Sequence, residues 1–241
     1  MILIPMAGLS SRFFNAGFTE PKYMLEVHGR SLFEHAVSSF KYYFNSEHFV
    51  FVVRNVYSTC DFVDSKAIEL GIRSYEIVAL DEVTRGQAET VYIALEKIDF
   101  CDGSLTVFNI DTFRPGFRFP EKDTGDGYLE VFKGDGEHWS FVEPAPGVEG
   151  LVKRTAEKER ISDLCSTGLY HFSSAQDFIR SYLDFLKKPQ SEWTKGELYI
   201  APLYNLMIES GRYVHYHVID RGEVIFCGTP DEYYSLMENK I

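Results

Sequence analysis

Short apolar runs alternate with amphipathic stretches along the first 110 residues of the chain. The apolar runs predict four buried strands, over 1–7, 48–54, 74–80 and 104–111. The amphipathic stretches have helical spacing and predict helices over 31–44, 59–71 and 86–98. At the start of the first helix, Ser31 and Glu34 fit a capping box. Because strands alternate with helices, we expect an α/β fold with a largely parallel, doubly wound sheet, whose ligands bind beyond the carboxyl ends of the strands.

The second half of the chain has a different pattern. It is rich in Gly, Pro and Asp from 113 onward, and KGDGEH at 133–138 predicts a hairpin turn between the strands YLEVF and WSFVE. Strand-like segments continue to STGLYHF at 166–172, and helices are predicted over 174–187 and about 199–210. A strand, YVHYHVI, and a helix, DEYYSLMEN, come last. Since the chain has no repeat, low-complexity tract or linker, we predict a single domain over 1–241.

The composition is that of an acidic globular protein. Of the 241 residues, 45% are apolar, which is enough for a sizeable core. The net charge is −12, with 36 acidic and 24 basic residues, and this argues against general binding to nucleic acid or to anionic membranes. Any bound anion must therefore be held by a local group of basic side chains.

Cysteine usage and hydropathy favour a cytoplasmic protein. The cysteines are scattered without metal-binding spacing, and we expect buried free thiols in a reducing compartment at Cys60, Cys101, Cys165 and Cys227. No run reaches the roughly 18 apolar residues of a membrane span, and we expect no secretory leader. Neither a membrane nor a nucleic acid is an expected partner.

A loop of small residues follows the first predicted strand, in MAGLSSRFFNAGFTEPKYML at 6–25. Gly8, Ser10 and Ser11 let the backbone turn tightly and bring its N–H groups close to a ligand, as in many phosphate-binding loops. Arg12 can hold phosphate oxygens bidentately, and Lys22 adds a second positive charge. Taken alone, the pattern also fits a plain connection, because it is neither a Walker loop nor a GxGxxG motif.

The order of these residues resembles the signature loop of the sugar nucleotidyltransferases, the nucleoside-diphosphate-sugar pyrophosphorylases. The family pattern, A-G-x-G-x-R followed by P-K, is matched by AGLSSR at 7–12 and EPK at 20–22, and the apolar motif that follows it is matched within VHGRSLFEHAV. The chain departs from the pattern at Ser10, where the family usually has glycine, so we expect the backbone to approach the phosphates less closely or at another angle. The resemblance implies nucleotide contacts by Ala7, Gly8, Ser10 and Ser11.

Two further motifs match in order. TRGQAETV at 84–91 lies where the family reads the base, which implies contacts from Gly86, Gln87 and Glu89. NID at 109–111 ends a predicted strand where the family carries a metal-binding aspartate, so Asp111 is the metal candidate. Mg²⁺ keeps most of its waters, so one carboxylate and phosphate oxygens suffice to bind it. Alone, the first motif is also typical of a helix N-terminus with an acidic first turn, and the second of a strand-end turn.

The acceptor side of the resemblance lies in the second half. VKRTAEKERISDLCSTGLYHF at 152–172 resembles the family's EKP…STGLYVF region, and TKGELYIAPLYNLM at 194–207 resembles its R-G-E-L-E-I-T-D segment. Lys158 would contact the acceptor phosphate. Sugar contacts are implied for Glu157, Ser166, Thr167, Gly168 and Glu197. By itself, a charge run such as KRTAEKER is more typical of a solvated face.

The last motif departs from the family at one position. VIFCGTPDEYYSL at 224–236 resembles W-x-D-x-G-T-P-x-D, and it matches at Gly228, Thr229 and Pro230. The family's second metal aspartate falls on Phe226, which cannot ligate a metal. Asp220 and Glu223 are the alternative carboxylates, and the second ligand stays open.

The resemblance covers nearly the whole chain and implies its fold and its reaction. The implied fold is a Rossmann-like (GT-A-like), mostly parallel central sheet with helices on both faces and a smaller β-rich sugar-binding region. Residues 1–112 would form the nucleotide-binding half, and 113–241 the acceptor half. The implied reaction transfers a nucleoside monophosphate from an NTP to a sugar 1-phosphate or similar monoester, with Mg²⁺, for surface polysaccharide precursors.

Two other functions stay open on the sequence. A nucleotide-sugar-dependent glycosyltransferase would use NID as a DxD-like metal motif, although Arg12 and Lys22 suit a triphosphate better. A non-catalytic sugar-nucleotide sensor would explain Phe226 and Ser10. The sequence specifies neither the base, nor the acceptor, nor the oligomeric state.

Overall fold

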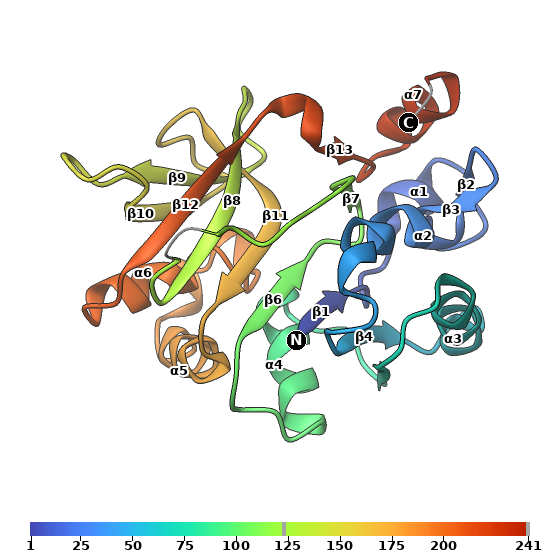
Figure 1. Ribbon diagram of the computed structural model, residues 1–241, viewed down its shortest axis with the longest axis horizontal. Coiled ribbons are helices and arrows are strands. Elements are labelled where there is room, and N and C mark those ends of the chain that lie inside the picture. Colours follow the sequence, from blue (N-terminus) through green and yellow to red (C-terminus); the bar gives the residue numbers. More distant parts are fainter. Residues whose placement is uncertain (122–123, 240–241) are drawn as a thin grey trace. The chain divides into compact units, whose positions relative to one another are not determined.

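The computed structural model describes residues 1–121 and 124–239, and it consists of two compact units that interleave along the sequence (Figure 1). The first, called here the parallel-sheet unit, comprises Ile2–Val83, Asn109–Arg118 and Gly222–Ile241. The second, the mixed-sheet unit, comprises Met1, Thr84–Phe108 and Phe119–Arg221.

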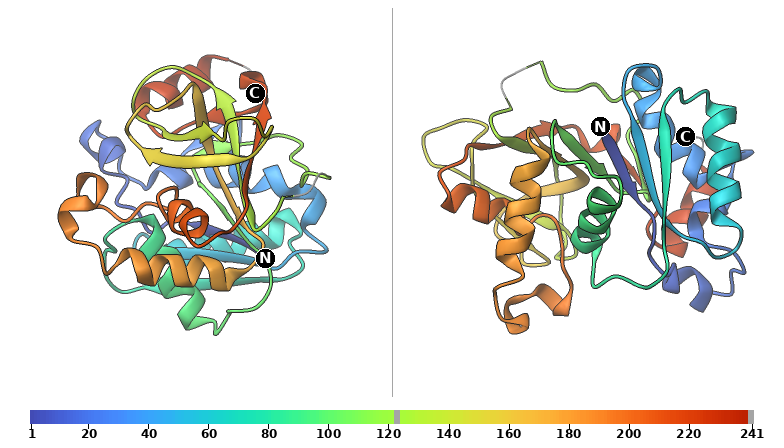
Figure 2. Two further views of the ribbon diagram at one scale, coloured as in Figure 1. Left: turned by 90° about the vertical axis from the view of Figure 1, so that its left-hand side faces the viewer. Right: turned by 90° about the horizontal axis from the view of Figure 1, so that it is seen from below.

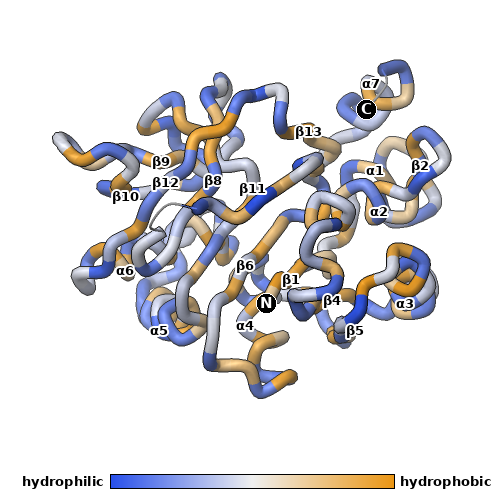
Figure 3. Tube along the Cα trace, in the orientation of Figure 1, coloured by the Kyte–Doolittle hydropathy of each residue, from blue (hydrophilic) through white to orange (hydrophobic). Residues whose placement is uncertain are grey.

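Three parallel strands form the sheet of the first unit. They are β1 (Ile2–Pro5), β4 (Phe49–Arg54) and β5 (Tyr75–Leu80), with β4 between the other two. Ile2 to Ile4 and Phe49 to Val53 are fully buried, as expected of parallel strands covered on both faces. Both strands stand out as apolar stretches in Figure 3. The predicted strands and their parallel pairing are confirmed here.

Two predicted helices flank this sheet. α2 (Leu32–Val37) begins at the predicted capping box, in which Glu34 N donates to Ser31 Oγ at 3.2 Å and Ser31 N donates to the Glu34 carboxylate at 2.9 Å. The predicted helix continues beyond Val37 only as the 3₁₀ helix η2 (Ser38–Tyr43). α3 (Thr59–Leu70) packs against β4 and β5 and ends at Gly71, whose φ of 76° allows the left-handed cap (Figure 2).

Short elements complete the parallel-sheet unit. They are α1 (Ser11–Asn15), η1 (Lys22–Met24), β2 (Glu26–Val27), β3 (Arg30–Ser31), β7 (Thr112–Phe113), β13 (Ile225–Phe226) and α7 (Pro230–Glu238). β2 pairs with β3 and β7 pairs with β13, both antiparallel. The 3₁₀ helix η5 (Arg221–Glu223) spans the boundary between the units.

The mixed-sheet unit is built around one long strand, β11 (Leu164–Phe172). It pairs antiparallel with β6 (Leu105–Phe108), β8 (Gly127–Lys133) and β9 (Ser140–Pro144). Outside these, β10 (Val152–Glu157) pairs antiparallel with β9, and β12 (Val214–Ile219) pairs parallel with β8. The other elements are α4 (Gln87–Lys97), α5 (Ala175–Phe185), η3 (Gln190–Glu192), η4 (Thr194–Gly196) and α6 (Leu203–Glu209).

The predicted hairpin at 133–138 is wrong, although both of its strands form. β11 pairs with each of them, so that Cys165 faces Phe132 of β8 and Phe141 of β9. Turn residues report only on the local chain. A long, buried strand such as β11 must pair its backbone N–H and C=O groups on both edges, and here it does so with these two strands. The helix predicted from about 199 also begins later, after Pro202.

The four cysteines are free thiols, as predicted, but they are not all buried. Cys165 and Cys227 are buried, Cys60 is half-buried and Cys101 is exposed. Among the described residues, no helix is long and apolar enough to cross a membrane.

A half-buried imidazole lies in β11 of the mixed-sheet unit. His171 stacks on Tyr128 with 4.9 Å between the ring centroids, and its Nδ1 lies 2.9 Å from Thr106 Oγ1. Burial lowers the pKa of His171 to about 4, and the positive charge of the N-terminal amino group adds to this effect. The side chain is therefore neutral in the folded protein at neutral pH.

We expect the folded protein to lose stability as the pH falls below 6.5, in part because of His171. Between pH 6.5 and about 4 the unfolded chain binds a proton that the folded chain does not, so the free energy of unfolding decreases through this window. From pH 7 to pH 5 this group alone accounts for roughly 2 kcal/mol. In urea denaturation, the free energy of unfolding of His171→Gln should decrease less between pH 7 and pH 5 than that of the wild type. His138→Gln, at an exposed position, is the control, and an equal loss in all three proteins would contradict the prediction.

Candidate functional site

The predicted phosphate loop leaves the carboxyl end of β1. Its first residues stay in register with β4, because Met6 N donates to Val52 O at 2.8 Å. Gly8 is exposed, and a Cβ added there would meet no atom within 4 Å, so the loop borders open space. Ser10 adopts the left-handed conformation (φ 51°, ψ 27°) that glycine adopts most easily. Ser10 therefore has the backbone conformation that a glycine at this position would adopt readily.

Two cations and one carboxylate meet beside this loop. Lys22 Nζ donates to Asp111 Oδ2 at 2.6 Å, and Lys22 N donates to Ser10 Oγ at 3.2 Å. Burial by itself would raise the pKa of Asp111, but the charges of Lys22 and Arg12 lower it below its usual value. Arg12 is exposed on α1. The structure thus brings together Ser10, Arg12, Lys22 and Asp111, all predicted from the sequence.

A segment near the C-terminus supports Asp111 from the other side. Cys227 N donates to Asp111 O at 2.8 Å, which continues the pairing of β13 with β7. A Cβ on Gly228 would lie 3.1 Å from Asp111 Oδ2, so a larger residue there would crowd the carboxylate. Thr229 then caps α7 through a capping box with Glu232. The segment at 227–229 therefore supports the aspartate through the backbone of Cys227 and leaves room for its carboxylate at Gly228.

The structure offers no second carboxylate in the position of the family's second metal ligand. Phe226 occupies that position in β13, opposite Thr112. Of the alternatives, Glu223 forms an ion pair with Arg114 at 3.2 Å, and Asp220 follows β12 in the other unit. Within 1–121 and 124–239, no three His, Cys, Asp or Glu residues cluster as a metal site would. Asp111 fits a magnesium ion that takes its other ligands from phosphate and water.

The predicted base-reading loop lies in the mixed-sheet unit and is joined to the segment at 197–199. Leu198 N donates to Arg85 O, and Ala88 N donates to Leu198 O, both at 2.9 Å. Gly86 has a φ of 151°, and a Cβ added there would lie 2.5 Å from Leu198 O. Only glycine therefore allows this backbone approach, which places the predicted base-reading loop beside a predicted sugar-binding segment.

Glu89 bonds within the same loop. Arg85 Nε donates to the Glu89 carboxylate at 2.7 Å, and Tyr182 OH donates to it at 3.4 Å. Burial raises the pKa of Glu89, but the hydrogen bonds and charge of Arg85 outweigh this and lower it. The guanidinium of Arg85 also lies 5.5 Å from the centre of the Trp193 ring. Glu89 thus shapes the loop, and the predicted base contacts of Gln87 and Glu89 stay predictions.

On the acceptor side, Glu157 is almost completely buried at the end of β10, with 8% of its surface exposed. Ser140 Oγ donates to its carboxylate and lies 3.1 Å from Tyr170 OH. Burial raises the pKa of Glu157, and the negative charge of Glu197 acts in the same direction. Glu157 and Glu197 are therefore within electrostatic reach of each other, as an acceptor site built from both would require.

The STG motif forms an irregular part of β11. Its pairing with β8 shifts between Ser166 and Tyr170, and Gly168 has a φ of 90°. The hydroxyls of the motif bond locally: Ser166 Oγ accepts from Gly168 N at 3.1 Å, and Thr167 Oγ1 lies 3.2 Å from a carboxylate oxygen of Glu130. Bulges of this kind often redirect side chains beside binding sites.

Lys158 forms a contact that the sequence reasoning missed. Its Nζ donates to Tyr199 OH and lies 4.1 Å from the centre of the tyrosine ring. Three residues to which the sequence motifs assign no role contact predicted site residues: Ser140, Arg85 and Tyr199. The sequence does contain an indication for Tyr199. Side chains two residues apart in an extended segment lie on the same side, and Tyr199 is two residues after the predicted sugar-binding residue Glu197.

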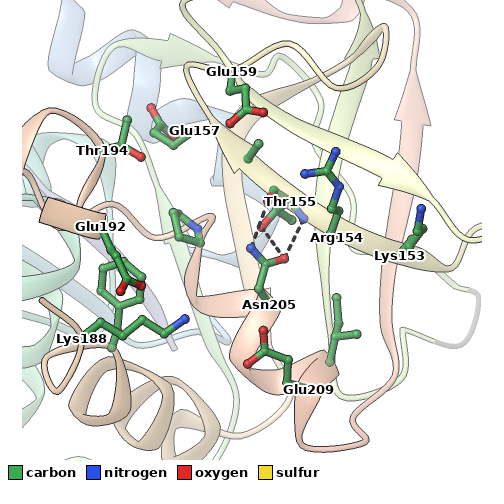
Figure 4. A pocket seen from close by; sticks show the side chains of 14 residues that line it. Lys153, Arg154, Thr155, Glu157, Glu159, Lys188, Glu192, Thr194, Asn205 and Glu209 are labelled. Carbon is green, nitrogen blue, oxygen red and sulfur yellow. Dashed lines mark hydrogen bonds between the residues drawn. The ribbon is translucent and has the colours of Figure 1, made fainter.

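A cavity of about 370 Å³ lies in the mixed-sheet unit between β10, α6 and the segment after α5 (Figure 4). Asn205 closes part of its wall, since its amide accepts from Thr155 N at 2.8 Å and donates to Thr155 O at 3.0 Å. Charged side chains of both signs line it: Lys153, Arg154, Lys188, Glu157, Glu159, Glu192 and Glu209. Of the predicted acceptor residues, only Glu157 lines this cavity.

Comparisons with solved structures agree with this geometry. A nucleoside-diphosphate-sugar pyrophosphorylase from Vibrio cholerae RC9 is 56% identical, over 99% of this chain and 100% of that one, with a TM-score of 0.96. An inositol-1-phosphate CTP transferase from T. maritima is 17% identical, over 98% and 94%, with a TM-score of 0.74. A UDP-glucose pyrophosphorylase from Acinetobacter baumanii is 15% identical, over 98% and 91%, with a TM-score of 0.69. The last two show a shared fold. No protein-family model and no curated protein matches the chain.

Replacing Gly86 with alanine should loosen the base-reading loop. The new Cβ would lie 2.5 Å from Leu198 O, so the loop and the segment at 197–199 must separate. We expect a loss of about 1–3 kcal/mol in the free energy of unfolding and weaker nucleotide binding, measured by denaturation and calorimetry. Gly222→Ala is the control, because a Cβ there meets no atom within 4 Å. Equal stability and binding in the two variants would contradict the packing argument.

Proposed function

The chain belongs to the nucleoside-diphosphate-sugar pyrophosphorylase family, and we propose that it transfers a nucleoside monophosphate from an NTP to a sugar 1-phosphate or a similar phosphate monoester, releasing pyrophosphate. The observation that supports this most is the group formed by Arg12, Lys22 and Asp111 beside the loop after β1. Two cations and a carboxylate at this point suit a triphosphate with a divalent metal ion.

The reaction needs positioning and charge neutralisation more than proton transfer. An oxygen of the acceptor phosphate attacks the α-phosphorus in line, and the bond from that phosphorus to the bridging oxygen of pyrophosphate breaks. The acceptor phosphate is largely a dianion at neutral pH, so no general base is required. Arg12 would hold the β- and γ-phosphates and steady the leaving pyrophosphate. Lys22 would contact the α-phosphate and the incoming phosphate.

The contact between Lys22 and Asp111 is compatible with both roles. An ammonium group has three donors, so Lys22 can bond to Asp111 and still donate to phosphate oxygens. Asp111 would hold the magnesium ion as its one protein carboxylate. When bound, magnesium neutralises phosphate charge and orients the triphosphate.

The remaining roles fall to the mixed-sheet unit. Lys158 would bind the acceptor phosphate, while Glu157 and Glu197 would accept hydrogen bonds from hydroxyls of the acceptor. The loop at 84–87 would contact the base. Support comes from the electrostatic effect of Glu197 on Glu157 and from the backbone bonds between Leu198 and the loop.

We place this reaction in the cytoplasm, as a supply of activated precursors for surface polysaccharide. Support for the compartment comes from the four free cysteines, which are typical of a reducing environment. The polysaccharide role depends on the family resemblance alone.

Removing either cation should abolish turnover and leave the fold intact. We expect Arg12→Ala and Lys22→Ala to lower the rate of pyrophosphate release by at least about 100-fold, because each removes charge stabilisation of the transition state. Circular dichroism should be unchanged. Arg73→Ala is the matched control, since Arg73 is an exposed arginine of the same unit that precedes β5 at its amino end. Wild-type turnover in the first two variants would refute the assigned roles.

Calorimetric titration with ATP, GTP, CTP, UTP and dTTP should identify one preferred triphosphate, with binding that depends on Mg²⁺. Asp111→Asn should reduce the gain in triphosphate affinity that Mg²⁺ produces, because it removes the negative charge of the proposed metal ligand. If only nucleoside diphosphates or their sugar conjugates bind, the chain is instead a glycosyltransferase or a sensor. The absence of a second carboxylate at Phe226 is the observation that favours a sensor.

A further inference from the structure

We propose that Tyr199 is a positioning residue, which holds the ammonium group of Lys158 in the orientation needed to bind the acceptor phosphate. That Lys158 binds an acceptor phosphate depends on the proposed function, whereas the contact between Lys158 and Tyr199 is present in the structure. Lys158 Nζ donates to Tyr199 OH, and it also lies 4.1 Å from the centre of the ring. The tyrosine therefore engages the cation mainly through its hydroxyl, with the ring beside it.

A lysine needs such a partner more than an arginine does. Its ammonium group sits on a flexible four-carbon stem, and holding it in one place costs rotamer entropy. A single acceptor such as Tyr199 OH occupies only one of the three N–H donors of an ammonium group. A carboxylate in the same place would also neutralise the charge. A neutral phenol orients the cation and preserves its attraction for an anion.

The backbone of Lys158 restricts the side chain further. Lys158 follows the last residue of β10 and has a φ of 55°, in the left-handed region that non-glycine residues seldom adopt. Its N–H donates to Trp139 O at 2.8 Å, which holds this conformation. Strained, well-anchored backbone of this kind is concentrated at functional sites, where it directs a side chain.

Tyr199 itself is held firmly. Its neighbours Leu198 and Ile200 are at most 1% exposed, and the Leu198 backbone bonds to Arg85 and Ala88 of the base-reading loop. The residue is half-buried, so packing restricts its ring. A rigid element that supports a flexible functional side chain is the arrangement that a positioning role requires.

Kinetics of Tyr199→Phe and Tyr199→Leu test the role in catalysis. Phenylalanine keeps the ring and removes the hydroxyl, and leucine removes both. With α-D-glucose 1-phosphate as the probe acceptor, we expect Tyr199→Phe to raise the KM for this acceptor roughly 3–10-fold, and Tyr199→Leu to raise it more. The KM for the triphosphate and kcat should stay within about twofold. Tyr213→Phe, at a residue that is 65% exposed, is the control. An unchanged acceptor KM, or an equal rise in both KM values, would overturn the proposal.

A second measurement tests the contact without any turnover. Acetic anhydride labels lysines that present an accessible amine, and mass spectrometry of the digested protein reports the rate at each lysine. We expect Lys158 to be labelled faster in Tyr199→Phe than in the wild type and in Tyr213→Phe, because the ammonium loses its hydrogen bond to the tyrosine hydroxyl. Equal rates in all three proteins would refute the positioning role even if the proposed reaction is correct. A wild type that is inactive with every acceptor, but shows the difference in labelling, would refute the proposed function instead.

Discussion

The ion pair between Lys22 and Asp111 is the interaction on which the candidate phosphate site depends. It joins two residues 89 positions apart at a distance of 2.6 Å. Burial alone would favour the protonated form of Asp111, and the positive charge of Lys22 keeps the carboxylate ionised. Ser10 accepts a hydrogen bond from the backbone N–H of Lys22, and the backbone N–H of Cys227 donates to the backbone carbonyl of Asp111. Three separate stretches of the chain thus converge on one carboxylate.

Close backbone approach is a second constraint, and each unit uses glycine for it. Gly228 leaves room for the carboxylate of Asp111, because a Cβ there would lie 3.1 Å from Oδ2. In the other unit, Gly86 lets the base-reading loop approach Leu198, where a Cβ would collide with the carbonyl oxygen at 2.5 Å. In both cases the glycine permits close contact with a segment that carries a predicted site residue.

The acidity of the chain is compatible with anion binding because the site's cations are local. With a net charge of −12, long-range attraction does not favour a triphosphate, so the proposed binding of a triphosphate would depend on short-range contacts. Arg12 has no ion-pair partner among the described residues, and it lies close enough to lower the pKa of Asp111. In the proposed function, Asp111 would be the one protein carboxylate at the magnesium ion, which suits a site whose other ligands come from the substrate.

The sequence by itself determined the local elements and most of the residue types of the site. Burial patterns and capping chemistry are local, so β1, β4, β5 and the capping box at Ser31 were predicted correctly. Tertiary structure decided what each element meets. It placed β11 between two strands expected to form a hairpin, brought Tyr182 to Glu89, and brought Tyr199 to Lys158. The two side-chain contacts join positions 93 and 41 residues apart through side-chain direction and strand order, which no local pattern of hydrophobic and polar residues encodes.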